Sequence, residues 1–348
     1  MSIIVFLIIL SVLVLAHEFG HFLVAKRAGA RVDEFGLGFP PRLFSWRRGE
    51  TLYSINLLLF GGFVKILGEN PHLGVELLSE DEKSKSLNLK PAHIQASVLV
   101  AGVFFNLLLA WVLLSISLMI GLPYNPEKSL GAEYIRDPVI VIVEILPDTP
   151  AEKAGLRTGD HLLGFESVKE VQNFTAVNKG QEVKIIYERE GEKFTTNITP
   201  PLGVSLDFLG AAHLPIHLAI LEGIRFTSIK TWDIIRSVGM LIGGIFTGAS
   251  SLQMLTGPVG IVDVVGQAMN LGFSYLLFFM AFISINLAVL NLLPIPALDG
   301  GRLLFLLIEK LKGSPMRPRV ASVANLIGFA LLIFLMIAVT INDLIKLF

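Results

Sequence analysis

The sequence predicts a multi-pass α-helical membrane protein of about four transmembrane helices, with a membrane-associated β segment and a small α+β domain inserted outside the bilayer. Of its 348 residues, 53% are hydrophobic and only 16% are charged, whereas ordinary soluble proteins carry about 25% charged residues. The apolar residues are concentrated in long runs, while residues 138–201 are polar and rich in turn residues. A net charge of -1 gives no indication of nucleic-acid binding.

Four apolar segments are long enough to cross a bilayer, which takes about 20 residues. The first has no basic residues before it and no small-residue cleavage site after it, so we expect a transmembrane helix rather than a signal peptide. A fifth apolar stretch, 234–265, contains many glycines and serines together with Gln253, Pro258 and Asp263. It favours an amphipathic or interfacial helix, with a short extra crossing as the alternative. The four predicted spans cover residues 3–25, about 94–122, about 273–293 and about 320–341.

Basic residues predict the orientation of these spans, because cytoplasmic loops carry an excess of Lys and Arg. No basic residue precedes the first span, whereas three follow it closely, and further basic clusters precede the second and fourth spans. The linkers 26–93 and 294–319 are therefore expected in the cytoplasm, with both termini outside. The predicted domains are the first half of the membrane core (1–122), an outer region (123–213), an interfacial helical segment (214–272) and the second half of the core (273–348).

Two segments have the alternating, turn-rich pattern of β structure. Residues 30–70 contain two predicted strands, 51–59 and 62–67, joined by a turn at Gly61-Gly62. The edge of such an apolar hairpin needs hydrogen-bond partners if it enters lipid. Residues 138–201 predict a small soluble domain, with a strand at 139–145 and a hairpin that turns at Glu190-Gly191.

His17, Glu18 and His21 form the pattern HExxH inside the first span. On a helix the two histidines share one face, so both imidazoles can bind one Zn²⁺, and Glu18 is placed as a general base beside it. Three ionisable groups in an apolar helix are costly, which favours a functional site. The alternative is a polar cluster at the helix end that reaches the cytoplasmic interface, a position that Lys26 and Arg27 already occupy.

Asp299 is the predicted third metal ligand. The chain has no cysteines, so the ligands must be histidines or carboxylates. Asp299 is the only carboxylate between Asp263 and Glu309, and the third span ends just before it at the cytoplasmic depth expected for HExxH. Two prolines break the helix there. The alternative is that Asp299 caps the following helix, 302–312.

Other polar residues in apolar surroundings give weaker signals. Gly102 and Asn106 form GxxxN in the second span, where Asn106 could face the site or make an ordinary interhelical hydrogen bond. His213 and His217 are spaced i, i+4, but Pro215 lies between them and no glutamate is placed as a base. We expect these two histidines to be surface or interfacial residues.

Taken together, these residues resemble the site-2 protease family, specifically the bacterial RseP-like membrane zinc proteases, over nearly the whole chain. The resemblance implies that His17, His21 and Asp299 bind one Zn²⁺ and that Glu18 is the catalytic base. It rests on four motifs in the family's order: HEFGH (17–21), GGFVKILGE (61–69), AGVFFN (101–106) and NLLPIPALDGG (291–301).

The resemblance also implies a substrate site and a substrate class. A transmembrane helix must be unwound before cleavage, and pairing with a strand edge would hold it extended. The substrates would be single-span membrane proteins, either anti-sigma-factor-like regulators that a site-1-type protease trims first or remnant signal peptides. The protein would lie in the bacterial cytoplasmic membrane, with its active site toward the cytoplasm. The implied substrate-binding residues are Asn291, Asn106, Gly61, Gly62, Phe63 and Val64.

Residues 138–201 resemble a PDZ domain of the bacterial protease type through PDTPAEKAGLRTGD (147–160). They depart from that pattern at FESVKE (165–170), where such domains often turn through Asn-Gly, so we expect an altered or closed peptide groove. The interval 123–213 has room for one such domain, outside the cytoplasm. TGPVGI (256–261) resembles a family segment before the third span.

Three other functions are alternatives on the sequence alone. A transporter or channel would also place ionisable residues in the membrane, but no inverted repeat is visible. A scaffold presenting a PDZ domain has no need for a complete metal-ligand set. A soluble-type zinc protease with an anchor would carry HExxH outside the apolar run. Assays of substrate cleavage and of transport flux distinguish a protease from a transporter or channel. Metal analysis of the purified protein distinguishes a zinc enzyme from a scaffold.

Overall fold

The computed structural model describes residues 1–69, 78–189, 191–247, 257–314 and 316–347. The chain divides into two compact units, one made of residues 1–114 and 224–348 and the other of residues 115–223. The first unit contains a two-stranded sheet among long helices, and the second is built on a six-stranded sheet.

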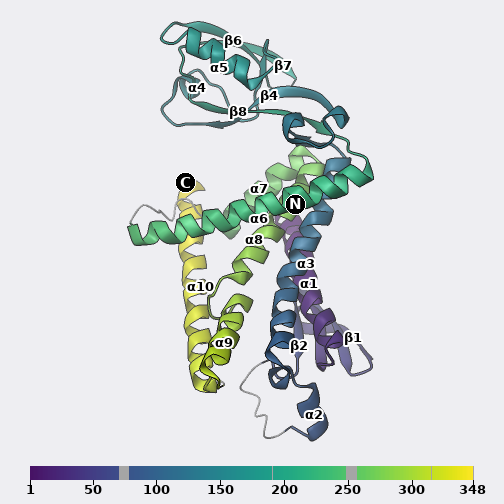
Figure 1. Cartoon of the computed structure of the whole chain (residues 1–348). Helices are drawn as coiled ribbons and strands as arrows, with labels where there is room; N and C mark the ends of the chain where they lie inside the picture. Colours follow the sequence, from purple (N-terminus) through teal and green to yellow (C-terminus); the bar gives the residue numbers. More distant parts are fainter. Residues whose placement is uncertain (70–77, 190, 248–256, 315, 348) are drawn as a thin grey trace. The chain divides into compact units, whose positions relative to one another are not determined.

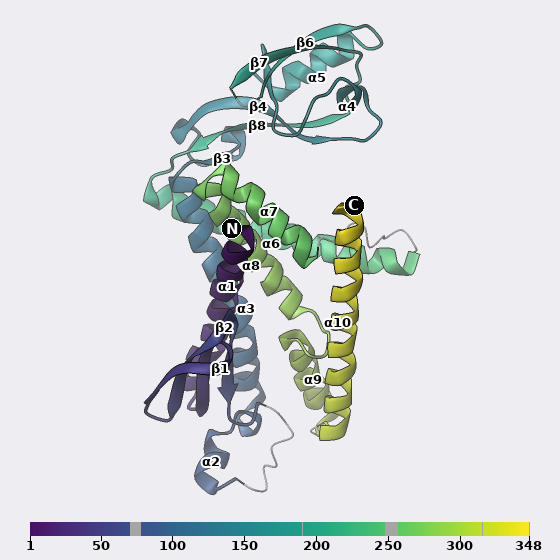
Figure 2. The same cartoon turned by 180° about the vertical axis from the view of Figure 1, so that it is seen from behind.

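Four helices are long and apolar enough to cross a membrane, by length and composition. They match the four predicted spans, and charged residues are nearly absent from their central turns. Both cartoon views place α1, α3 and α8 side by side (Figures 1 and 2). The four helices are α1 (Ser2–Arg27), α3 (Ala92–Met119), α8 (Phe273–Leu292) and α10 (Pro318–Leu347).

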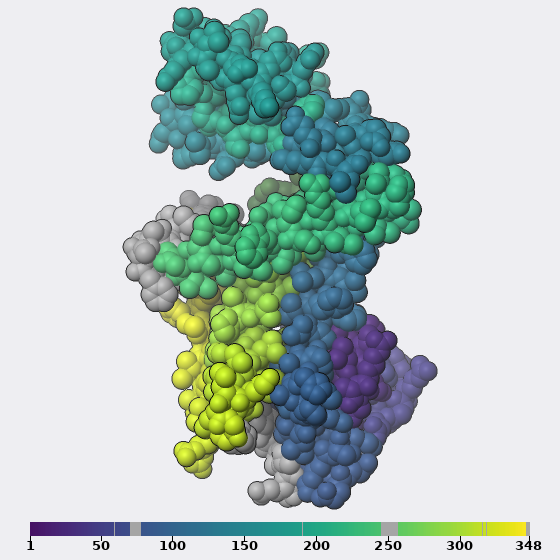
Figure 3. All heavy atoms as spheres, in the orientation of Figure 1, coloured from purple at the N-terminus to yellow at the C-terminus, as the bar shows by residue number. Residues whose placement is uncertain are grey.

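The helices α3 and α8 form the centre of the first unit. Ala110 of α3 and Ala281 of α8 are fully buried in one apolar cluster, together with Leu114 and Ile285. Small side chains at such positions allow two helices to approach closely in an apolar environment. On the face seen in Figure 3, atoms of α3 (blue) meet those of the chain from α8 onward (green to yellow).

A β segment formed by β1 (Val32–Arg48) and β2 (Thr51–Ile66) contacts α1. The predicted turn at Gly61-Gly62 is wrong, because β2 runs through it and the chain reverses at Gly49-Glu50 instead. Gly61 adopts φ +95° within the strand, a conformation that glycine adopts without strain. Residues 34–37 of β1 have partners in both halves of β2, at 52–55 and at 62–65, so the sheet curls back on itself.

The predicted interfacial segment contains two helices, α6 (Ile216–Thr247) and α7 (Pro258–Leu271). The part at 248–256, with Gln253, lies outside the described residues. The amides of Gly257 and Gly260 donate to the buried carboxylate of Asp343 in α10, at 3.1 and 2.8 Å. The described part of TGPVGI therefore begins α7, and Asp343 satisfies amides that a helix start leaves unpaired.

The second unit has its own sheet and apolar core. Its strand order is β3-β8-β4-β5-β6-β7, with the short α4 (Pro150–Lys153) and α5 (Val168–Val177) packed on it. The predicted strand at 139–145 and the β6–β7 hairpin are confirmed, although Glu190 in its turn lies outside the described residues. The strands are β3 (Leu122–Tyr124), β4 (Ile135–Ile145), β5 (His161–Leu163), β6 (Val183–Arg189), β7 (Glu192–Ile198) and β8 (Val204–Ala212).

Candidate active site

The helix α1 places His17 and His21 on one face, one turn apart. Both side chains are buried, and their Nε2 atoms are 3.1 Å from each other. The Nδ1 atom of His21 is 2.8 Å from the carbonyl oxygen of Val98 in α3. If this nitrogen donates to the carbonyl, the lone pair of Nε2 remains available to a metal ion.

Asp299 reaches the two histidines from a distant part of the chain. After α8 ends, the chain turns sharply, with Ala297 at φ +79°, and α9 (Asp299–Lys312) begins. The Oδ2 atom of Asp299 is 3.0 Å from Nε2 of His17 and 3.3 Å from Nε2 of His21. The capping alternative is wrong, because Leu298 is the N-cap residue of α9 and no side chain caps it.

Glycines allow these elements to approach each other. A Cβ atom on Gly102 of α3 would lie 2.5 Å from Nε2 of His21 and 2.6 Å from Cε1 of His17. A Cβ atom on Gly20 of α1 would lie 2.4 Å from the carbonyl oxygen of Ala101. Any larger residue at either position would push α1 and α3 apart at the histidines.

The three side chains fit a zinc ion. They are the one group of His, Cys, Asp and Glu residues in the described part of the chain whose ligand atoms converge closely enough to hold a metal. Oδ2 of Asp299 is buried and has no hydrogen-bond partner of good geometry, although two ring nitrogens lie close to it. Ligand atoms at about 2.0–2.1 Å from a tetrahedral zinc lie about 3.3 Å from one another, which agrees with the observed spacings.

The surroundings also favour the ligating form of Asp299. Burial alone would raise the pKa of this carboxyl, but the neighbouring imidazoles of His17 and His21 lower the pKa by more. The pKa of Asp299 is therefore held well below its usual range, and the group stays a carboxylate.

Glu18 faces the same cavity from α1. The cavity has a volume of about 250 Å³, and its lining includes both histidines, Glu18, Glu69 and Asp299. The Oε2 atom of Glu18 accepts a hydrogen bond of 3.0 Å from the backbone amide of Val64 in β2. A carboxylate and three converging ligand atoms thus border one small space, and the carboxylate also contacts the backbone of β2.

Comparison with known proteins identifies the family. The family model described as Peptidase family M50 matches residues 5–335. The chain belongs to this family. It is 33% identical to the zinc metalloprotease RasP of Shouchella clausii and 30% identical to the regulator of sigma-W protease RasP of Bacillus subtilis, and each comparison covers 100% of this chain and 99% of the relative.

Family membership establishes the class of enzyme. This M50 protein is a zinc metalloprotease, and its family and relatives perform proteolysis in the membrane. Its four apolar helices and its bacterial relatives indicate a multi-pass protein of the inner membrane.

The remaining predicted site residues differ in where they lie. Asn291 lines the cavity, with Nδ2 3.5 Å from Nε2 of His17. Asn106 is fully buried behind His17, with its amide 3.3 Å from Nδ1 of that ring. Val64 contacts Glu18, whereas Phe63 covers Gly36 of the neighbouring strand.

Two residues that border this site had no signal in the sequence pattern. Glu69 lines the cavity, and Arg302 of α9 donates to its Oε1 atom over 2.7 Å. Glu69 ends the motif GGFVKILGE, and Arg302 begins the helix predicted after Asp299. The opposite charges of these two residues do not by themselves predict that they pair.

Proposed function

We propose that this protease cleaves single-span membrane proteins at a zinc ion held by His17, His21 and Asp299, with Glu18 as the general base. The observation that carries the proposal is the convergence of Oδ2 of Asp299 on the Nε2 atoms of both histidines, at 3.0 and 3.3 Å. A bound zinc ion would acidify water and polarise a peptide carbonyl. Glu18 would take the proton of the attacking water and deliver it to the leaving amine.

The proposal gives Asn106 a supporting role. A His17 ring that binds metal through Nε2 carries its proton on Nδ1. Oδ1 of Asn106 is buried and has no hydrogen-bond partner in the described structure, and a half-turn of the amide exchanges the places of Oδ1 and Nδ2. With its amide turned, Oδ1 would accept the Nδ1 proton over the observed 3.3 Å. Asn106 would then orient the ligand, and Asn291, which lines the cavity, would be the asparagine that faces substrate.

The substrate would bind as an extended strand along β2. Its helical carbonyls are hydrogen-bonded and inaccessible until the helix unwinds, and pairing with a strand edge stabilises the unwound form. Gly61, Gly62, Phe63 and Val64 form the stretch of β2 that ends beside Glu18. The substrate classes we favour are anti-sigma-factor-like regulators, trimmed first by a site-1-type protease, and remnant signal peptides, because a B. subtilis relative is named a regulator of sigma-W protease.

We further propose that residues 138–201 form a PDZ domain outside the cytoplasm, with both termini on the same side. A groove of about 470 Å³ is lined by α5 and the start of β8, including Val171, Leu202 and Leu206. Val168, in the segment that departs from the PDZ pattern, is part of the lining of this groove. An extended peptide end fits a groove between a strand and a helix.

Co-expression with candidate single-span substrates tests the function. The wild type is expected to cleave a substrate that Glu18→Gln leaves intact, while zinc content stays near one per chain in both. Cleavage by Glu18→Gln at the wild-type rate would remove Glu18 from the mechanism. Failure of the wild type to cleave any single-span substrate, with zinc bound, would contradict the proposed substrate class.

A further inference from the structure

The last residues of β2 turn two amides toward carboxylates of the active site. The amide of Val64 donates to Oε2 of Glu18 over 3.0 Å, and the amide of Ile66 is 3.4 Å from Oε2 of Glu69. Amides two residues apart on a strand point to the same side. This edge of β2 therefore contacts Glu18 at one step and Glu69 at the next, and both of these carboxylates line the cavity.

Glu69 is in turn held by α9. Arg302 donates through Nη1 to Oε1 of Glu69 over 2.7 Å and through Nη2 to its backbone oxygen over 2.8 Å. Arg302 follows Asp299 by three residues, so the two side chains emerge from one face of the first turn of α9. Two charge-assisted contacts from a planar guanidinium fix orientation as well as distance. The first turn of α9 thus carries the predicted metal ligand, Asp299, and also Arg302, which binds Glu69 just after β2 ends.

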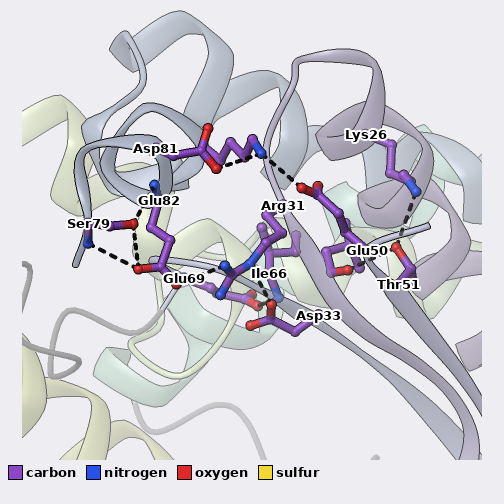
Figure 4. Close-up of polar contacts among 12 residues, drawn as sticks. Lys26, Arg31, Asp33, Glu50, Thr51, Ile66, Glu69, Ser79, Asp81 and Glu82 are labelled. Carbon is purple, nitrogen blue, oxygen red and sulfur yellow. Dashed lines mark hydrogen bonds and ion pairs between the residues drawn. The ribbon is translucent and has the colours of Figure 1, made fainter. Parts of the chain in front are cut away.

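The other side of this strand end is held separately. The amide of Leu67 donates to the carbonyl of Arg31, and Arg31 pairs with Asp33 and with Glu82 of α2 (Glu80–Lys85). Figure 4 shows this network around Ile66 and Glu69. It joins β2 to the end of α1 and to α2. In the described part of the chain, the Arg302–Glu69 pair joins this strand end to α9.

We propose that Glu69 and Arg302 are positioning residues that set which peptide bond of the substrate is cut. The inference rests on the proposed function, in which β2 aligns the substrate backbone and the metal site receives one carbonyl. A slip of one residue moves a strand by about 3.3 Å and turns every carbonyl to the other side. By holding the end of β2 at a set distance from Asp299, the ion pair selects the residue whose carbonyl reaches the metal.

Cysteine cross-linking tests the register without requiring cleavage. The chain contains no cysteines, so Lys65→Cys, on the exposed side of β2, gives one unique thiol. It is combined with Glu18→Gln and with a synthetic single-span peptide that carries one cysteine at successive positions. We expect one peptide position to dominate the disulfides formed. Adding Glu69→Gln is expected to spread them over neighbouring positions, and an unchanged single maximum would overturn the proposal.

Cleavage of the same peptide by the full chain gives a second readout. For Glu69→Gln we expect zinc content near one per chain, product ends at several adjacent bonds by mass spectrometry, and kcat lowered about 10- to 100-fold, the cost of a misplacement of about 1 Å. Arg302→Lys, which keeps the charge but loses the planar fork, should give an intermediate spread. Lys85→Ala, which breaks the exposed pairs with Glu50 and Asp81, is the matched control and should leave the product ends unchanged.

The outcomes separate this inference from the proposed function. Loss of zinc in both Glu69→Gln and Arg302→Lys would mean that the pair holds the metal site rather than the substrate, and would overturn the inference. A single product end in both variants would do the same. A Lys65→Cys chain with Glu18 intact that forms the single cross-link, while the cysteine-free chain never cleaves the peptide, would count against the proposed function, although the register that the cross-link reveals would still stand.

Discussion

Two acids with buried carboxylate oxygens, one in each unit of the chain, show how differently a carboxylate can be used. Asp160 in the second unit is 1% exposed and receives two hydrogen bonds of 2.7 Å from Arg189 and one of 2.8 Å from the amide of Arg157. Asp299 in the first unit has no arginine or lysine partner in the described structure, and its buried Oδ2 atom faces two imidazole nitrogens. Burial by itself is therefore a poor sign of function. The informative feature is that the lone pairs of Asp299 and the two imidazoles point to one place, with no arginine or lysine beside them in the described structure.

Removal of zinc should have the largest effect and should separate the two units. A chelator is expected to abolish cleavage, because the ion that acidifies water and polarises the peptide carbonyl is then absent, and added zinc should restore cleavage. The second unit, whose buried acid carries its own cation, should keep its thermal unfolding transition. The measurement is peptide cleavage beside calorimetry of the full-length protein. A chelator that lowers the transition of the second unit would contradict the comparison.

Gly102→Ala should come next. Its Cβ atom would lie within 2.7 Å of both imidazoles, so we expect the ligands to shift and cleavage to fall about 100-fold, the effect of a misplacement of about 1 Å. Gly239→Ala in α6, which would meet nothing within 4 Å, is the matched control. Equal activity of the two variants would show that the close approach of α1 and α3 does not shape the site.

Asn106→Ala should weaken the metal site without destroying it. Loss of a hydrogen bond to a ligating histidine costs about 10- to 100-fold in metal affinity. Asn286→Ala serves as the control, because in the described structure the side chain of Asn286 donates to Phe282 of its own helix. Competition with a zinc-sensitive dye gives the affinities. Unchanged affinity in Asn106→Ala would assign this residue to helix packing alone.

Asp160→Asn should have the smallest effect on cleavage and a clear effect on stability. Neutralising the buried partner of Arg189 destabilises by about 3 kcal/mol, because Arg189 loses the negative charge of its ion pair. We expect a lower unfolding temperature for the second unit and a zinc content equal to wild type. A loss of zinc in this variant would mean that the two acids are not independent.

The parts of the site that depend on local spacing could be predicted from the sequence. HExxH fixes the relation of His17 to His21 because a helix repeats every 3.6 residues, whatever surrounds it. Predicting Asp299 as a ligand needed one more step, namely that the first and third spans both end at the cytoplasmic face of the membrane. Four spans, and a β segment after the first, followed from length and alternation.

The rest depends on contacts between elements, which alternation does not specify. The pattern at 51–67 correctly indicated strands but not their partners, so the turn at Gly61-Gly62 was wrong and the curl of β1 around both halves of β2 was not foreseen. The contacts of Glu18 with Val64 and of Glu69 with Arg302 follow from that curl. They join residues 46 and 233 positions apart, and no local signal in either segment marks them.

Zinc analysis of the purified protein tests the central claim most directly, when it is combined with X-ray absorption at the zinc edge. The account predicts one zinc per chain in the wild type, with two imidazole nitrogens and carboxylate oxygen at about 2.0–2.1 Å, and substantially less than one zinc in Asp299→Ala. A full zinc complement with an unchanged absorption spectrum in Asp299→Ala would contradict it.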